Sequence, residues 1–356
     1  MTEQPGPIVL LGSGETAPGA QKIYHRLFSQ IDDEVRVAIL ETPAGYEPNS
    51  DFVAKQVGRY LEQRLQNFRP SIQIVPARKR GTAFSPDDAT IASALYDANV
   101  LFMGPGSPTY TVRQLQDSVV WHTLRACHRL GAAVILASAA TLAISRLTLP
   151  VYEIYKVGED LHWKAGLDFF GDFGLSTIFV SHWNNKDGGE LLDTSRCYMG
   201  QPRFEALLAI TPHGRDDYTV VGIDEKTALV IEPATGVCTV MGIGAVTIIR
   251  HGETAVYGAG QRFPATVLGP FCPPAPGEGI PDTIWQATAT GRAAAAQKRL
   301  SQPTPDPAVL ALLDQRQAAR AGKDWAGADH LRAQIAARGW RVLDTPTGPA
   351  LEPANA

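Results

Sequence analysis

The apolar run 132–137 ends on Ser138, which is followed by two more small residues, Ala139 and Ala140. Several α/β hydrolases present a nucleophilic serine in this way, on a tight turn between a buried strand and a helix whose N-terminus faces the developing oxyanion. A serine at such a position can also simply cap the helix that follows it. The pattern alone therefore leaves two interpretations of Ser138, a nucleophile and a helix cap.

Two further strand ends carry residues suited to the same chemistry. His182 follows the apolar run 178–180 and precedes a polar loop, 183–189, while Asp224 and Glu225 end another apolar run. Ligand-binding and catalytic residues of parallel α/β sheets gather at the carboxyl ends of the strands. We therefore predict that His182 is a general base whose ring is oriented by a carboxylate, although a solvent-exposed strand-end histidine and a turn acid would give the same pattern.

Glycine-rich turns follow two of the predicted strands. Gly104-Pro105-Gly106 comes where a strand ends and a helix starts, so its backbone N–H groups could bind an anion or an oxyanion. An ordinary strand-to-helix turn has the same composition. The turn at Gly12 and Gly14 lacks the third glycine and the later acidic residue of a dinucleotide-binding fingerprint.

Composition narrows the class of protein. The 356 residues are 44% hydrophobic and 19% charged, as in an ordinary globular protein, and a net charge of −4 gives no general attraction to nucleic acid or anionic membranes. The four cysteines lie far apart without zinc-ligand spacing, so we expect reduced thiols, no metal and no other cofactor. No signal peptide and no membrane-spanning run are evident. We therefore predict a cytoplasmic protein.

Alternating apolar runs and helical patterns in the first half predict βαβ units and a parallel sheet. The expected strands are 8–11, 35–40, 72–75, 99–103 and 132–137, and the expected helices are 19–30, 51–67, 86–96 and stretches from 109 and from 141. Later short apolar runs are expected to complete or extend the same sheet: 175–180, 218–224, 227–231, 237–241 and 245–249. We divide the chain into a main domain at 1–260, a proline- and alanine-rich connector at 261–305 and a small unit at 306–352.

The order of these motifs resembles the dipeptidase E and cyanophycinase family of serine peptidases over roughly residues 7–250. The segment 222–228, Gly-Ile-Asp-Glu-Lys-Thr-Ala, is similar to the family's acid motif, and residues 242–247 resemble the strand that follows it. The resemblance implies the flavodoxin-like fold of class I glutamine amidotransferases, an α/β fold with a mostly parallel sheet and helices on both faces. It further implies a triad of Ser138, His182 and Glu225 that hydrolyses small aspartyl peptides or β-aspartyl amide bonds through an acyl-enzyme.

The serine turn and the glycine turn depart from the family pattern. Residues 136–141 read Leu-Ala-Ser-Ala-Ala-Thr where the family has Gly-Thr-Ser-Ala-Gly-Ala, so both glycines are replaced. Pro105 stands at a position usually held by glycine and has no N–H to donate, so we expect Gly106 and Ala139 to supply the oxyanion donors. The second hypothesis is therefore a catalytically inactive amidotransferase-like fold that binds a small ligand or tRNA.

Basic residues beyond His182 are candidates to hold an acidic substrate side chain. They are Lys186, Arg196 and Arg203, for which exposed, solubilising charge is the alternative interpretation. The expected small-molecule partner is an acidic peptide or amide, and the sequence leaves the oligomeric state open.

The segments 313–325, 328–332 and 339–348 resemble the C-terminal segment of cysteinyl-tRNA synthetases, which implies two short helices and a β-turn that help recognise the anticodon end of tRNA. The signature motifs of that enzyme's catalytic part are absent, which excludes aminoacylation. Helical spacing places three basic residues on one face, where they could meet RNA phosphates: Arg316, Arg320 and Lys323.

The same small unit is balanced in charge, with six basic and six acidic residues over 306–356. A module that docks on its own domain or on a partner is therefore the alternative to tRNA contact. We expect its small core to contain four aliphatic residues together with Val342 and Trp325; the four are Leu312, Leu313, Leu331 and Ile335.

Overall fold

The computed structural model describes residues 4–301, 305–345 and 348–354. The chain divides into two compact units, one ending at Arg292 and the other beginning at Ala293. The division falls inside the segment 261–305 that the sequence marks as a connector. We describe each unit by itself.

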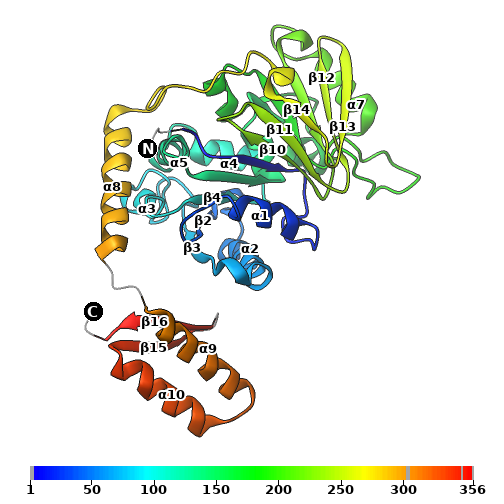
Figure 1. Cartoon of the computed structure of the whole chain (residues 1–356). Coiled ribbons are helices and arrows are strands. Elements are labelled where there is room, and N and C mark those ends of the chain that lie inside the picture. Colours follow the sequence, from blue (N-terminus) through cyan, green and yellow to red (C-terminus); the bar gives the residue numbers. More distant parts are fainter. Residues whose placement is uncertain (1–3, 302–304, 346–347, 355–356) are drawn as a thin grey trace. The chain divides into compact units, whose positions relative to one another are not determined.

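Among the described residues, eight strands form the central sheet of the first unit in the order β14-β11-β10-β1-β5-β4-β2-β3 (Figure 1). Five of them are parallel: β1 (Ile8–Leu11), β5 (Ala133–Ala137), β4 (Val100–Met103), β2 (Arg36–Leu40) and β3 (Ser71–Val75). Three antiparallel strands extend the sheet beyond β1: β10 (Thr227–Glu232), β11 (Val237–Gly242) and β14 (Arg262–Pro264).

Helices cover both faces of this sheet (Figure 1). Alternate residues of a strand point to opposite faces, so Ile8 and Leu10 join one core while Val9 and Leu11 join the other. Helices α1 (Ala20–Phe28) and α2 (Ser50–Arg64) pack on the second core, and α3 (Ala89–Ser93), α5 (Val119–Arg129) and α6 (Ala139–Ala143) pack on the first. The predicted α/β fold, a mostly parallel sheet with helices on both faces, is confirmed.

The remaining elements of the first unit are shorter or lie at its edges. The helices are α4 (Pro108–Leu115), α7 (Gly200–Ala209) and α8 (Asp282–Ser301), of which α8 extends past the unit boundary. The short helical turns are η1 (Thr42–Ala44), η2 (Gln66–Phe68), η3 (Glu153–Val157), η4 (Phe169–Phe173), η5 (Arg215–Asp217) and η6 (Ala265–Leu268), and β6 (Leu147–Thr148) pairs with β7 (Lys164–Ala165).

Four of the described strands form a second sheet, in the order β13-β12-β9-β8. They are β8 (Thr177–Val180), β9 (Thr219–Ile223), β12 (Ala245–Arg250) and β13 (Glu253–Gly258). The prediction that all the later strands extend the first sheet is therefore wrong. The chain turns sharply between Ile223 and Thr227, so β9 pairs with β8 and β12 while β10 returns to β1. Apolar runs identify strands but do not identify their pairing partners.

The second unit contains α9 (Pro307–Ala321), α10 (Trp325–Ala337) and a hairpin of β15 (Trp340–Thr345) and β16 (Gly348–Pro353). The two expected helices are confirmed. Of the buried residues expected in the core, Leu312, Ile335 and Val342 are present, but Trp325 is 58% exposed and Trp340 takes its place. Both tryptophans follow turns, and helical spacing alone did not distinguish them. In the described ranges we find no helix long and apolar enough to span a bilayer.

Candidate active site

Ser138 occupies the sharp turn between β5 and α6. Its backbone has φ 53° and ψ −110°, a conformation that L-residues rarely adopt. The turn is tied to β1, because the Ser138 amide donates to Leu11 O at 3.1 Å and the Thr141 hydroxyl donates to the same carbonyl at 3.0 Å. Within the described chain the Ser138 hydroxyl makes no capping bond to α6. The side chain therefore does not act as a helix cap.

The two residues that replace the family's glycines lie in the core. Leu136 and Ala140 are both buried in the cluster on one face of the central sheet. Neither residue is among those described as lining the cavity that contains Ser138. The loss of these glycines is thus compatible with the sharp turn at Ser138.

His182 bridges Ser138 and Glu225. Its Nε2 lies 2.9 Å from Ser138 Oγ, and its Nδ1 lies 2.7 Å from Glu225 Oε1. The histidine follows β8 with φ 51°, and its amide donates to Gly12 O at 3.2 Å. A Cβ at Gly12 would lie 2.2 Å from Asp224 O, so that glycine serves close packing of strand ends. The three side chains have the contact pattern of a nucleophile, a base and an orienting acid.

Two asparagines after His182 hold Glu225 in place, and sequence reasoning missed both. Asn185 is buried and its Nδ2 donates to Glu225 Oε1 at 2.9 Å, while Asn184 Oδ1 accepts from the Glu225 amide at 2.8 Å. The signal available in the sequence was the Asn-Asn pair in a polar loop that directly follows the candidate base.

Asp224 hydrogen-bonds to the start of β12 and has a structural role. Its Oδ2 accepts a hydrogen bond from the Ala245 amide at 2.9 Å, which ties the end of β9 to the start of β12. Burial raises the pKa of this carboxyl group. Of the two adjacent acids that the sequence offered, the structure brings Glu225 to His182.

The glycine turn packs tightly against η1. Gly106 has φ 148°, and a Cβ there would lie 1.9 Å from Pro43 O, so no other residue fits without moving the backbone. The Ser107 amide donates to Pro43 O at 2.9 Å. Both Gly106 and Ala139 border the cavity that contains Ser138, and Ala139 is the first residue of α6, where amides have no intrahelical acceptor.

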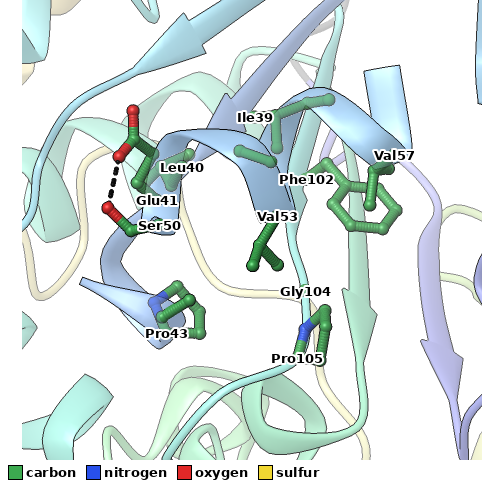
Figure 2. A pocket seen from close by; sticks show the side chains of 12 residues that line it. Ile39, Leu40, Glu41, Pro43, Ser50, Val53, Val57, Phe102, Gly104 and Pro105 are labelled. Carbon is green, nitrogen blue, oxygen red and sulfur yellow. Dashed lines mark hydrogen bonds between the residues drawn. The ribbon is translucent and has the colours of Figure 1, made fainter. Parts of the chain in front are cut away.

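An ion pair between the buried Glu41 and the partly exposed Arg78 supports η1. Glu41 Oε2 lies 2.6 Å from Arg78 Nε and accepts a hydrogen bond from Ser50 Oγ at 2.8 Å. Figure 2 shows this carboxylate at the edge of a small apolar pocket that Gly104 and Pro105 also line. The pocket has a volume of about 10 Å³. The pocket is too small for a ligand, and the ion pair stabilises the segment that carries Pro43.

Ser138 and His182 border a larger cavity of about 530 Å³, within the usual range for small-molecule sites. Its wall includes apolar residues, three tyrosines and two charged groups: Gly106, Pro108, Ser138, Ala139, Leu142, Val151, Tyr152, Tyr155, Lys156, His182, Asp187, Cys197 and Tyr198. Burial raises the pKa of the Cys197 thiol to about 12, so this cysteine is not a second nucleophile. Nowhere in the described ranges do His, Cys, Asp or Glu side chains cluster as metal ligands.

The structure brings none of the three predicted substrate-binding residues to the described wall of this cavity. The Arg196 guanidinium lies 4.7 Å from the centre of the Trp183 ring, and Arg203 donates to two backbone carbonyls of the same loop. Lys186 is exposed. Lys156, which sequence reasoning missed, is the lysine that lines the cavity. It lies on η3, a turn for which the sequence shows no distinctive pattern.

The three predicted RNA-binding residues do not form one open stripe. Arg316 is 1% exposed and makes a bidentate pair with Asp344, at 2.9 and 3.0 Å. Arg320 also contacts Asp344, at 2.9 Å, whereas Lys323 is exposed. The assignment of Arg316 as an RNA contact is therefore corrected, because this side chain joins α9 to the hairpin inside the second unit.

The second unit matches a known family. The family described as "Cysteinyl-tRNA ligase anticodon binding domain" matches residues 302–348. A cysteine–tRNA ligase of Burkholderia lata is 58% identical over 43 residues, and one of Opitutus terrae is 53% identical over 47 residues. These matches cover 12% and 13% of this chain but 9% and 10% of the two relatives. The similarity is confined to this terminal segment, and the chain spans about a tenth of each ligase.

The first unit is similar in fold to a solved peptidase. A peptidase from an acI-B1 Actinobacterium superposes with a TM-score of 0.58 at 20% identity, covering 74% of this chain and 98% of that one. A putative peptidase E protein from Listeria monocytogenes EGD-e superposes less well, with a TM-score of 0.42 at 13% identity, covering 71% and 98%. The first of these comparisons shows that this chain shares the fold of that protein over 74% of its length.

Proposed function

We propose that the first unit is a serine-type hydrolase with Ser138 as nucleophile, His182 as general base and Glu225 as the group that orients the imidazole. The observation that carries the proposal is the contact between Ser138 Oγ and His182 Nε2, 2.9 Å, made from a strained backbone. Strain of this kind costs about 1–3 kcal/mol and persists where surrounding structure maintains it. A serine that merely ended a strand would gain nothing from it.

The proposed reaction is acyl transfer to Ser138 followed by hydrolysis. His182 Nε2 takes the proton from Oγ as the oxygen attacks the substrate carbonyl carbon, and then gives that proton to the leaving amine. Water attacks the resulting ester with His182 again as base, which releases the acid and restores the serine. We assign the amides of Gly106 and Ala139 to the oxyanion, because both residues border the cavity beside Ser138.

The substrate class that we propose, small aspartyl peptides or β-aspartyl amides, comes from the resemblance of the motifs. A cytoplasmic location agrees with the four cysteines, all free thiols in the described structure. The competing proposal is a catalytically inactive protein that binds a ligand in the same cavity.

A fluorophosphonate probe with mass spectrometry of the labelled peptide tests the hydrolase directly. We expect labelling at Ser138, loss of labelling in Ser138→Ala, and unchanged labelling in Ser93→Ala, since Ser93 is an exposed helical residue that is not among the described lining residues of the cavity. Glu225→Gln should retain weak activity, because the nucleophile and the base remain while the imidazole is less well oriented. Labelling of another serine contradicts the assignment, and no labelling favours the inactive binding protein.

We also propose that the second unit contacts tRNA, as the match to an anticodon-binding domain suggests. Trp325 is 58% exposed and the Arg320 guanidinium lies 5.8 Å from its ring, an arrangement suited to stacking on an unpaired base. The test is a titration of the full chain with total tRNA at several salt concentrations. The double variant Arg320→Ala/Lys323→Ala should reduce the slope of the logarithm of the binding constant against the logarithm of salt concentration by about two. The control double variant Lys22→Ala/Arg59→Ala should leave this slope unchanged. If the chain does not bind tRNA even at low salt, the alternative interpretation of the second unit, a module that docks on its own domain or on a partner, is favoured.

A further inference from the structure

Asn185 places a buried amide group against the acid of the triad. Its side chain belongs to a residue that is 2% exposed, whereas the side chains of His182 and Glu225 are 18% and 30% exposed. Burying an amide costs free energy unless its donors and its acceptor find partners. The partners of this side chain therefore indicate what the residue does.

The loop that follows Asn185 fixes the orientation of the amide. Asn185 Oδ1 accepts a hydrogen bond from the backbone amide of Asp187 at 3.1 Å. Only the oxygen of the side chain can accept from an N–H group, so the NH2 group must point the other way. The backbone is held as well, because its amide donates to His182 O at 3.1 Å and its carbonyl accepts from the Thr194 hydroxyl at 3.5 Å. The loop thus presents a donor to Glu225.

This donor meets the carboxylate oxygen that also receives the imidazole. Glu225 Oε1 lies 2.7 Å from His182 Nδ1 and 2.9 Å from Asn185 Nδ2. Hydrogen bonds to an ionised carboxylate favour its ionised form. Asn184 acts differently, because its Oδ1 accepts from the backbone amide of Glu225. The contact of Asn185 therefore changes the proton affinity of the carboxylate, whereas the contact of Asn184 fixes the backbone.

We propose that Asn185 is a positioning residue that limits the basicity of Glu225. The inference rests on the proposed hydrolase, in which Glu225 must orient the imidazole and stabilise its cation without taking the proton. With two donors on Oε1, the carboxylate stabilises the imidazolium less strongly, so more of His182 is neutral and able to act as a base near neutral pH. Asn185 acts through Glu225, and it is not among the described residues that line the cavity.

Other titratable groups of the described chain face the triad, from the loop after His182 and from the turn after β9: Asp187, Cys197, Tyr198 and Asp224. Burial raises the pKa of the Cys197 thiol to about 12 and raises the pKa of the Tyr198 phenol, so both stay neutral near neutral pH. Asp187 needs its own control, because the side chain of Asn185 also lowers the pKa of that carboxyl group.

An NMR titration of His182 in the full chain, carrying carbon-13-labelled histidine, tests the proposal. The signal is assigned by its loss in His182→Gln. In Asn185→Leu the carboxylate loses one donor and stabilises the imidazolium more strongly, so the midpoint of the titration should rise by about one pH unit. The pH of half-maximal fluorophosphonate labelling of Ser138 should rise with it. Asp187→Asn, added to both proteins, should leave the difference between them in place.

Two further variants separate the lost donor from altered packing. Asn185→Ala lacks the donor and leaves a space that leucine would fill, so both substitutions should move the midpoint in the same direction. Thr194→Val removes the hydroxyl that bonds to the Asn185 carbonyl but keeps the amide of Asn185, and it should leave the midpoint unchanged.

Three results overturn the proposal. They are an unchanged midpoint in a folded Asn185→Leu or Asn185→Ala protein, an equal shift in Thr194→Val, and a shift that disappears when Asp187→Asn is added. The NMR titration needs no turnover, so it is separate from the test of the hydrolase. A protein that is not labelled at Ser138 but shows the expected shift would contradict the hydrolase and support the role of Asn185.

Discussion

At Ser138 the backbone stores strain that glycine would relieve. The residue has φ 53° and ψ −110°, where a Cβ is disfavoured and glycine is not. We expect Ser138→Gly to have a free energy of unfolding about 1 kcal/mol higher than that of Ser138→Ala, because both variants lose the hydroxyl but glycine alone loses the Cβ. Urea denaturation of the two variants measures the difference. A less stable glycine variant would mean that the turn is not strained.

At the scale of elements, the glycine turn depends on η1. Gly106→Ala places a Cβ against Pro43 O and should destabilise the protein by several kcal/mol or displace the turn, with loss of fluorophosphonate labelling. Gly104→Ala is the matched control, because a Cβ there meets the Phe102 ring edge at 3.3 Å, which can shift. Thermal unfolding and labelling rates check both variants. Equal effects of the two substitutions would contradict a special role for Gly106.

Helix α5 carries a histidine that makes stability depend on pH. His128 is fully buried with Nε2 2.9 Å from Gly6 O, and burial lowers its pKa to about 3. The unfolded chain takes up a proton below about pH 6.5, which the folded chain accepts only near pH 3, so stability falls as the pH falls through this window. Within this window His128 lowers the free energy of unfolding by about 1.4 kcal/mol for each pH unit of acidification.

His128→Gln isolates this effect. Glutamine can still donate to Gly6 O but does not titrate, so the variant should lose less stability than the wild-type protein between pH 6 and pH 4.5. Urea unfolding at several pH values measures the two slopes, and their difference removes the contribution of carboxylates that both proteins share. Parallel slopes would show that protonation of His128 does not oppose folding.

At the scale of the whole molecule, the first unit has its own cores. The clusters on both faces of the central sheet and the cluster under the second sheet lie before Arg292. We expect a chain that ends at Ser301 to unfold cooperatively, with a midpoint within a few degrees of that of the full chain. Calorimetry of the two proteins makes the comparison. An insoluble shortened chain would mean that the second unit protects an apolar surface of the first.

The family resemblances implied the helices on both faces of the sheet and the two helices of the second unit. The residue pattern itself predicted the alternation of strands and helices and the parallel sheet. Apolar periodicity and turn residues are local, so they carry this information without knowledge of the partners. The sequence also identified Ser138, His182 and Glu225 as candidates, because each follows an apolar run and strand ends meet at one edge of a parallel sheet.

Only the tertiary structure decided which residues meet. It placed β8, β9, β12 and β13 in a separate sheet, brought Glu225 rather than Asp224 to His182 and buried Arg316 against Asp344. It also put Lys156 and Asp187 on the wall of one cavity, 31 positions apart in the chain. Strand pairing and the direction of a side chain depend on contacts between distant segments, and spacing along the chain does not encode them.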